Sequence, residues 1–459
     1  MYRTEDMEKI NQNLSKIKDD AAKEYKTFYE PTLLEMSKVY NAIKNYIKKN
    51  NKIVYGGFAQ NLLIIKKNPD DAFYTNIDGA YFNWPDIADI EFYSTTPLED
   101  IINLTEELYA QGFKHIEGKE GIHPETYKIF VNFVNYCDIS YIPTHINNNM
   151  PIIIVDGIKC TNPHFMMVDA YRVLTDPMTS YWRLDKSITR FQTILKYYPI
   201  DESNVDKNII LQSTNDSVIK FIRKKIIQKS KLIAVGLHAF NYYAKKVTKK
   251  DVIKNIPYYE IISTNYEHDA KFIYNNLNKK FGNKISVKEF TPFFSFLDKH
   301  IEFFYDSMLI LKLYGNNQRC IVYNYSDKKK THFGTYNLVM MYLFFEYYYA
   351  LINRNKQNTQ LFNTLIGKFF KLRNTYLNYK KITVIDDSPF KDFTYKCYGI
   401  PVESIRSSLL SGLEKRKQGK QMKFSYGPSG KPKQPPDYNF SNISGNQILN
   451  EKYLILNKK

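Results

Sequence analysis

Residues 53–64 read IVYGGFAQNLLI, and residues 233–244 read IAVGLHAFNYYA. Each stretch is typical of a short apolar strand that turns at a glycine into a helix. The two share an isoleucine, a glycine, an alanine and an asparagine at one constant offset, which places Ile53, Gly56, Ala59 and Asn61 on Ile233, Gly236, Ala239 and Asn241. Similarity at a fixed internal offset indicates a duplicated domain.

Further segments extend the repeat in the same order. IEFYST (90–95) matches YEIIST (259–264), a helical stretch follows each, and HFMMVDAYRVL (164–174) resembles YNLVMMYLFFE (336–346). Strands are expected at 89–93, as one long strand at 127–143, and at 151–160, with helices between them. The pattern predicts an α+β fold, in which a mixed-sheet domain is followed by a second copy.

The two copies differ in their acidic residues. Asp89 of the first corresponds to Tyr258 of the second, Gly57 corresponds to Leu237, and Asp138 falls by a looser alignment in MLILKL (308–313). We expect a degenerate second copy with a structural or binding role. The predicted divisions are a helical segment 1–50, a catalytic domain 51–200, the degenerate domain 201–400 and a basic tail 401–459.

The chain of 459 residues carries a formal net charge of +18. Such a charge favours a polyanionic partner, although a lysine-rich codon bias would give the same excess. The tail is predicted to be a flexible basic arm, with Phe424 and Tyr426 available for stacking, or else a solvated linker. Its candidate RNA contacts are Lys415, Arg416, Lys417, Lys420 and Lys423.

The four cysteines are far apart and match no zinc pattern, so we expect free thiols in a reducing compartment. The N-terminal residues lack an apolar segment, so no signal peptide is expected. The most apolar stretch, 336–352, contains Glu346 and is interpreted as a buried core helix rather than a membrane span.

Asp89 and Glu91 stand two positions apart in DIEF (89–92). In a strand they share one face, while Ile90 and Phe92 point to the other. Neighbouring carboxylates repel each other unless a cation lies between them, and such hard oxygen ligands favour Mg²⁺ or Mn²⁺. The alternatives are a solvent-facing acidic pair, or a pairing of Asp89 with Asp86 that no strand face would support.

Asp138 interrupts the otherwise uncharged strand segment VNYCDISY (134–141). A lone acid in a sheet is costly unless it is paired or binds a metal, so Asp138 is a third candidate ligand or the partner of a nearby lysine. Gly56 and Gly57 let the backbone approach a ligand, and the helix start that follows them favours phosphate. A plain turn is the alternative for the two glycines.

Arg183, Lys186 and Arg190 follow one another at i, i+3 and i+7 in SYWRLDKSITR (180–190). On a helix they form one basic face, which is either a clamp for a triphosphate or a solvated face. Tyr181 and Trp182 could stack on a base, but we expect them in the core.

GGFAQN (56–61), ADIEFYS (88–94) and NYCDISY (135–141) together resemble the signature of the DNA polymerase β-like nucleotidyltransferases. Within that superfamily the layout is similar to the poly(A) polymerase catalytic subunits of large cytoplasmic DNA viruses, the giant amoeba viruses and poxviruses among them. Two departures stand out. The gap from Gly57 to Asp89 is longer than in the family, and Glu91 replaces the more common aspartate, which leaves the preferred metal open.

The resemblance implies template-independent polyadenylation of RNA 3′ ends, with AMP transferred from ATP at two Mg²⁺ or Mn²⁺ ions and pyrophosphate released. It implies that Asp89, Glu91 and Asp138 are catalytic and hold the metals. The implied nucleotide-binding residues are Gly56, Gly57, Asn61, Ser94, Arg183, Lys186 and Arg190.

The resemblance also implies an RNA 3′ end or poly(A) as the partner, and because half of the chain forms a second domain, we expect a self-sufficient homodimer. A separate processivity factor is the alternative to the homodimer, and no membrane is expected. The implied location is the host cytoplasm, in a viral factory, with packaging in the virion. Two other functions stay open: a CCA-adding or oligoadenylate-type nucleotidyltransferase, and a non-catalytic RNA-binding scaffold with a vestigial site.

Overall fold

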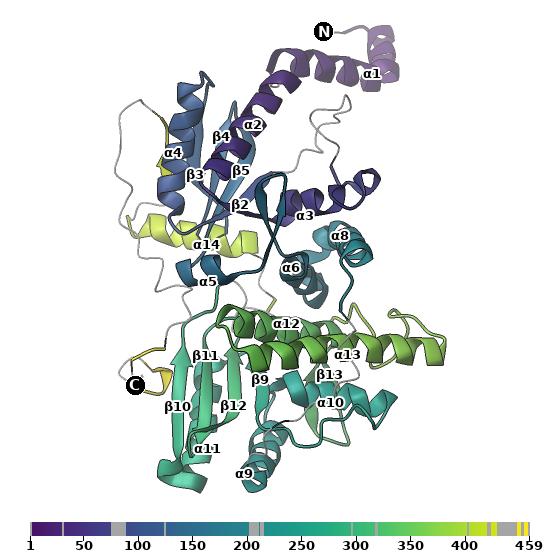
Figure 1. Ribbon diagram of the computed structural model, residues 1–459. Coiled ribbons are helices and arrows are strands. Elements are labelled where there is room, and N and C mark those ends of the chain that lie inside the picture. The colour runs from purple at the N-terminus through teal and green to yellow at the C-terminus, as the bar shows by residue number, and fades with distance from the viewer. Residues whose placement is uncertain are drawn as a thin grey trace.

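The computed structural model describes residues 2–29, 32–74, 89–123, 125–201, 211, 215–294, 297–316, 320–401, 404–419, 424–428, 448–450 and 454–457. Two domains follow one another along the chain, and each is built on its own mixed sheet (Figure 1). The predicted α+β class and duplicated architecture are confirmed.

The first sheet has the strand order β16-β3-β4-β5-β2-β1-β7-β6. Its strands are β1 (Ile53–Tyr55), β2 (Ile90–Ser94), β3 (Glu117–Glu120), β4 (Thr126–Val131), β5 (Val134–Tyr141), β6 (Ile152–Val155), β7 (Ile158–Thr161) and β16 (Ser425–Tyr426). Its helices are α2 (Leu33–Lys49), α3 (Gly56–Ile65), α4 (Pro97–Ala110), α5 (Thr144–Asn149), α6 (Pro163–Thr175), α7 (Pro177–Ser180) and α8 (Leu184–Tyr197).

The second sheet has the order β10-β11-β12-β9-β8-β14-β13-β15. Its strands are β8 (Ile233–Val235), β9 (Tyr259–Ser263), β10 (Ile285–Phe290), β11 (His300–Tyr305), β12 (Met308–Gly315), β13 (Ile321–Ser326), β14 (Thr331–Gly334) and β15 (Cys397–Tyr398). Its helices are α9 (Asp216–Phe221), α10 (Gly236–Val247), α11 (Tyr266–Phe281), α12 (Tyr336–Ile352) and α13 (Lys356–Lys380).

Seven strands of each sheet match in order, β3-β4-β5-β2-β1-β7-β6 with β10-β11-β12-β9-β8-β14-β13, while β16 and β15 are added at opposite edges. The strand before each glycine turn, β1 or β8, pairs antiparallel with β2 or β9, which in turn pairs parallel with β5 or β12. The same connectivity from two divergent sequences is what a duplication produces. The structure also supplies the alignment that was loose in the sequence, because Glu91 faces Asp138 and Glu260 faces Lys312 in the same register.

Helices α6 and α12 join the two domains in one continuous apolar core. Phe165 of α6 lies edge-on to Tyr348 of α12 with 4.9 Å between ring centroids, and the Tyr348 hydroxyl donates to Asn162 Oδ1 at 3.1 Å. Helix α12 is buried along nearly its whole length, as expected for a core helix. Among the helices in the described residues, none is long and apolar enough to span a membrane.

One predicted strand is in fact two. The segment expected to be a single strand over 127–143 is a hairpin of β4 and β5, which turns at Asn132 and Phe133. Both residues have positive φ, 49° and 65°, a backbone state that favours a tight two-residue turn between strands. The apolar alternation on both sides hid this turn.

The described part of the tail is ordered, contrary to the predicted flexible arm. Residues Ser404–Lys417 form helix α14, and β16 adds to the free edge of β3 in the first sheet. Tyr426 is buried there and Phe424 packs beside Tyr127, so neither ring is free to stack on RNA. The segment is anchored because its two aromatic side chains pack against the free edge of the sheet.

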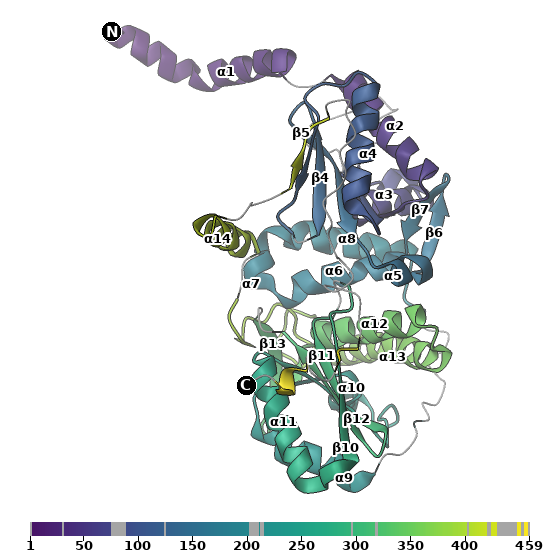
Figure 2. The same ribbon diagram turned by 90° about the vertical axis from the view of Figure 1, so that its left-hand side faces the viewer.

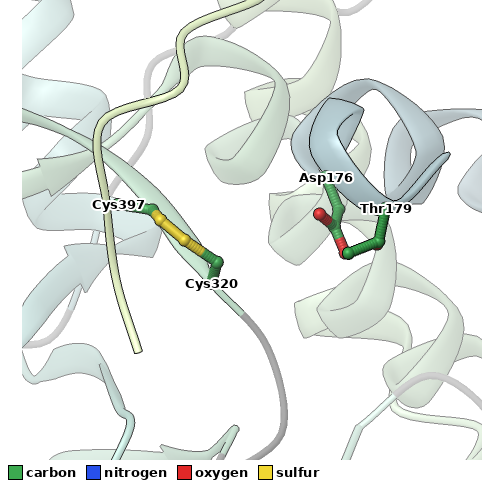
Figure 3. Close-up of a disulfide and its surroundings, with 4 residues drawn as sticks. All are labelled: Asp176, Thr179, Cys320 and Cys397. Atoms are coloured by element: carbon green, nitrogen blue, oxygen red, sulfur yellow. A yellow bond between two sulfur atoms is a disulfide. The ribbon is translucent and has the colours of Figure 1, made fainter. Parts of the chain in front are cut away.

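The expectation of four free thiols is wrong for two cysteines. Cys320 and Cys397 form a disulfide that ties β15 to the start of β13, with 5.3 Å between their Cα atoms (Figure 3). Cys137 and Cys160 are free and buried.

Candidate active site

The turn between β1 and α3 is shaped around Glu91. Gly56 has φ = +64°, and a Cβ at this position would overlap the Glu91 carboxylate. The Gly57 N–H donates to Glu91 Oε2 at 2.7 Å, so the carboxylate lies at the N-terminus of α3, where a helix favours negative charge. Only one carboxylate oxygen is used in this bond, which leaves Oε1 for another partner.

Three carboxylates lie on adjacent strands beside this turn. Glu91 of β2 is directly opposite Asp138 of β5, and Asp89 precedes β2 by one residue. Desolvation, opposed by the Gly57 N–H and reinforced by Asp138, raises the pKa of Glu91 to about 7. Desolvation and the charge of Asp138 also raise the pKa of Asp89. The charge of Asp138 thus contributes to both shifts, and a cation beside these carboxylates would offset this repulsion.

Lys128 of β4 forms an ion pair with Asp138. Its Nζ lies 2.7 and 2.6 Å from the two Asp138 carboxylate oxygens, and Asn135 Nδ2 donates to Oδ1 at 3.1 Å. The sequence left open whether Asp138 pairs with a nearby lysine, and in the structure it does. Within the described residues no three His, Cys, Asp or Glu side chains converge as a ready metal site.

The second domain keeps the turn and reverses the charges. Gly236 has φ = +56° and lies against Glu260, whose Oε2 accepts the Leu237 N–H at 3.3 Å. Lys312 occupies the position of Asp138, and Glu302 faces it where Lys128 faces Asp138.

The Lys312 ammonium of the second domain lies among carboxylates. It is 2.9 Å from Glu346 and 3.5 Å from Glu302, in the interior of the domain. Tyr258 replaces Asp89 next to this network. In the second domain a lysine thus stands where the first domain has the candidate metal ligand Asp138. Its ammonium group takes the place of a cation among the carboxylates, so the second copy cannot repeat the chemistry of the first.

The basic face of α8 reaches the glycine turn. A Cβ at Gly57 would lie 2.5 Å from Arg190 Nη2, so the missing side chain makes room for this guanidinium, which also donates to the Tyr74 hydroxyl. Desolvation and Asp138 raise the pKa of Asp89, and Lys186 partly opposes them. The ammonium group of Lys186 is therefore close to Asp89. Arg183 lies over the Trp182 ring at 4.6 Å. Tyr181 and Trp182 are 72% and 56% exposed, so their expected place in the core is wrong.

Two predicted nucleotide contacts have other partners. Asn61 receives the Phe73 N–H at 2.8 Å and donates to the Tyr74 carbonyl at 3.2 Å, and Asn241 holds Ile253 in the same way. Ser94 is buried and donates to Asp100, as Ser263 does to Asp269. The degenerate copy repeats both arrangements, so these side chains have a structural role in each domain, and their contact with a nucleotide stays a prediction.

The predicted RNA contacts lie on or beyond α14. Lys415 and Lys417 are exposed on this helix, and the backbone of Arg416 belongs to it. Lys420 and Lys423, like Asp86, lie outside the described residues.

Two residues near the site, Lys128 and Tyr74, were not predicted from the sequence. An alternating lysine one strand away from Asp138 would have been a signal for Lys128 had the turn at Asn132 been recognised.

The two glycines are expected to respond differently to alanine. Gly56→Ala forces positive φ and a clash with Glu91, so it should lower the free energy of unfolding by about 1–3 kcal/mol. Gly57→Ala displaces only the end of Arg190, so it should fold normally and raise the KM for ATP. Urea unfolding and steady-state kinetics separate the two, and a Gly57→Ala enzyme with unchanged KM would contradict the placement of Arg190 in the nucleotide site.

Comparison with known proteins identifies the family of the chain. The family model "Poly(A) polymerase catalytic subunit" matches residues 41–180, and "APMV, Putative poly(A) polymerase, catalytic subunit, C-terminal" matches residues 192–458. The "Putative poly(A) polymerase catalytic subunit" of Acanthamoeba polyphaga mimivirus is 32% identical over 99% of this chain and 84% of the relative. The protein of the same name from African swine fever virus (strain Badajoz 1971 Vero-adapted) is 25% identical over 37% of this chain and 35% of the relative.

A solved structure extends the agreement to the whole fold. The crystal structure of the Megavirus polyadenylate synthase superposes with a TM-score of 0.87 at 32% identity and covers 99% of this chain and 94% of that one. The chain therefore belongs to the family of viral poly(A) polymerase catalytic subunits, and it is a polynucleotide adenylyltransferase built on two copies of one fold.

Proposed function

We propose that AMP is transferred from ATP to an RNA 3′-hydroxyl beside Asp89, Glu91 and Asp138, and that the second domain takes no part in the chemistry. One observation carries the proposal. The two domains share the turn and its glutamate, but only the first has two further acids at the positions where the second has Tyr258 and Lys312.

The three acids fit hard divalent cations by their oxygen donors and their adjacent positions, and the raised pKa values of Asp89 and Glu91 reflect negative charge gathered at one place. Two Mg²⁺ or Mn²⁺ ions held there would make the 3′-hydroxyl a stronger nucleophile and stabilise the pyrophosphate leaving group. Glu91 is fixed by the Gly57 N–H, and Asp138 is held beside it by Lys128.

Arg190 and Lys186 supply positive charge for the triphosphate. Arg190 reaches Gly57 from α8, Lys186 of the same helix acts on Asp89, and a polyphosphate could approach Gly57 without a side chain of that residue in its way. Arg183 extends the same face, and the exposed Trp182 beneath it offers a flat surface to a base. Adenine selection rests on the family alone.

A primer-extension assay tests this proposal against its alternatives. We expect labelled oligo(A) to grow into a ladder when ATP and Mg²⁺ or Mn²⁺ are supplied. Short products without a primer, or addition confined to tRNA ends, would favour the oligoadenylate or CCA-adding alternative. If the wild type extends nothing in either metal while Asp89→Ala binds RNA normally, the vestigial scaffold would be the better description.

We also propose the division of the chain at about residues 50, 200 and 400, and a cytoplasmic place of action with packaging in the virion.

The partner of the chain is either a second copy or a separate processivity factor, and the name "catalytic subunit" of the relatives is compatible with the latter. We favour a homodimer because helix α1 (Thr4–Tyr29) extends away from the first domain with an apolar stripe uncovered (Figure 2).

The α1 stripe has the spacing of a two-stranded coiled coil. Met7, Ile10, Leu14 and Ile17 alternate in steps of three and four, and Met7, Leu14 and Ile17 are 43%, 47% and 48% exposed. We expect Leu14→Glu with Ile17→Glu to convert a dimer into monomers in sedimentation-velocity runs. Gln12→Glu with Lys16→Glu, on the other side of the helix, is the control, and a dimer that survives both pairs would exclude α1 as the interface.

A further inference from the structure

An aromatic cluster lies at the outer edge of the second sheet. Tyr323 of β13 stacks on Tyr398 of β15 with 4.5 Å between centroids and 8° between planes. His332 of β14 lies 4.7 Å from Tyr325 and 4.9 Å from Tyr398, whose hydroxyl is 2.9 Å from His332 Nε2. The Cys320–Cys397 disulfide fixes β15 beside β13, so the rings are held in place before any ligand arrives.

This cluster is open to solvent. Tyr325 is 44% exposed and Tyr395, next to β15, is 64% exposed, while His332 and Tyr398 are half-buried. Strand β15 ends the sheet order. Rigid rings at an exposed edge can accept a flat ligand at little cost in conformational entropy.

Lysines surround the rings. Lys396 Nζ lies 5.7 Å from the Tyr323 centroid and Lys231 Nζ lies 5.7 Å from the Tyr398 centroid. Lys329, in the β13–β14 turn, lies 5.3 Å from Phe333. In the described part of the chain these three ammonium groups form no ion pair, and the hairpin sequence 321–334 has Asp327 as its one acid. The surface therefore has unneutralised positive charge next to aromatic faces.

We propose that this surface, formed by Tyr325, His332, Tyr398, Lys231 and Lys396, binds single-stranded RNA. Bases stack on the exposed rings and the lysines contact phosphates, which is how proteins hold single strands without reading sequence. A duplex keeps its base faces covered and would gain little from the rings. The catalytic acids belong to the other sheet, so the surface holds a part of the strand other than its 3′ end.

The inference deepens the proposed function, because the strand would be the acceptor RNA of the polymerase. It gives the degenerate domain a role in RNA binding, which does not require the acids that this domain lacks. A second site on the same RNA would keep a growing product near the active site through multivalent binding.

Binding of a labelled single-stranded RNA of about 30 nucleotides, followed by fluorescence anisotropy, tests the surface. We expect Tyr325→Ala to weaken binding about tenfold. Lys231→Ala with Lys396→Ala should reduce the slope of log K against log salt by about 1.4, since each single-strand phosphate contact contributes about 0.7. Lys279→Ala with Lys280→Ala, exposed on α11 beside the opposite half of the sheet, removes the same charge and should change the affinity less.

Extension of an oligo(A) primer of about six nucleotides separates this inference from the function. A primer this short engages the active site alone, so all variants should extend it at the wild-type rate, which also shows that they fold. If Tyr325→Ala and the lysine pair bind the long RNA as tightly as the wild type, the surface is not an RNA site. An equal loss for a duplex of the same length would contradict base stacking. A wild type that binds long RNA but extends no primer would refute the function and leave this surface standing.

Discussion

Asp89→Asn is expected to reduce the rate of primer extension at least about a thousandfold, with the free energy of unfolding unchanged or slightly increased. The amide keeps the shape of the side chain and removes its charge, and a lost metal ligand costs several kcal/mol of transition-state stabilisation. Asp89 lies just before the first residue of β2 and its residue surface is exposed, so the scaffold does not depend on it. The measurement is single-turnover extension of oligo(A) at saturating ATP, together with urea unfolding.

Tyr258→Phe is the matched control for this variant, because Tyr258 occupies the same position in the second domain. It should retain nearly full activity. An Asp89→Asn enzyme with a tenth or more of the wild-type rate would place the chemistry elsewhere.

Lys312→Met is expected to lower the free energy of unfolding by about 3–5 kcal/mol, which is the cost of breaking a buried pair by removing one partner. The change leaves Glu346 and Glu302 without their cation, and Tyr314, which donates to Glu346 at 2.5 Å, cannot replace it. Burial lowers the pKa of Lys312, but Glu346 and Glu302 more than offset this and raise it well above 10.5. The stabilisation is therefore fully present at neutral pH and is lost only as the pH rises through that higher value.

Urea unfolding of Lys312→Met and of Lys284→Met measures this difference. Lys284 pairs with Asp306 at 3.1 Å on the surface, where a pair contributes at most about 1 kcal/mol. Equal effects of the two substitutions would mean that Lys312 does not hold the second domain together. Below its unfolding temperature Lys312→Met should still extend a primer, since it lies outside the active site.

The local signals in the sequence were enough to find the fold and the main groups of the site. A glycine turn after an apolar strand, two acids on one strand face and a third acid on a later strand are patterns within short windows, and the repeat pointed to those that the second copy lacks. Contacts across long separations were not predictable. Lys128 was missed because its strand was joined to that of Asp138, and the disulfide joins residues 77 positions apart.

Asn61 and Ser94 illustrate a second limit. Both stand inside the motif, but a motif does not tell whether a side chain faces a ligand or holds its own backbone. The degenerate domain shows the structural role, because Asn241 and Ser263 make the same contacts there.

Binding of Mn²⁺, followed by the loss of the free-ion electron paramagnetic resonance signal in the presence of ATP, tests the central claim most directly. The account predicts that Asp89→Asn with Asp138→Asn abolishes the protein-dependent binding, whereas Glu260→Gln, the second-domain counterpart of a change at Glu91, leaves it intact. Unchanged Mn²⁺ binding by the first variant, or its loss in Glu260→Gln, would contradict a metal centre confined to the first copy.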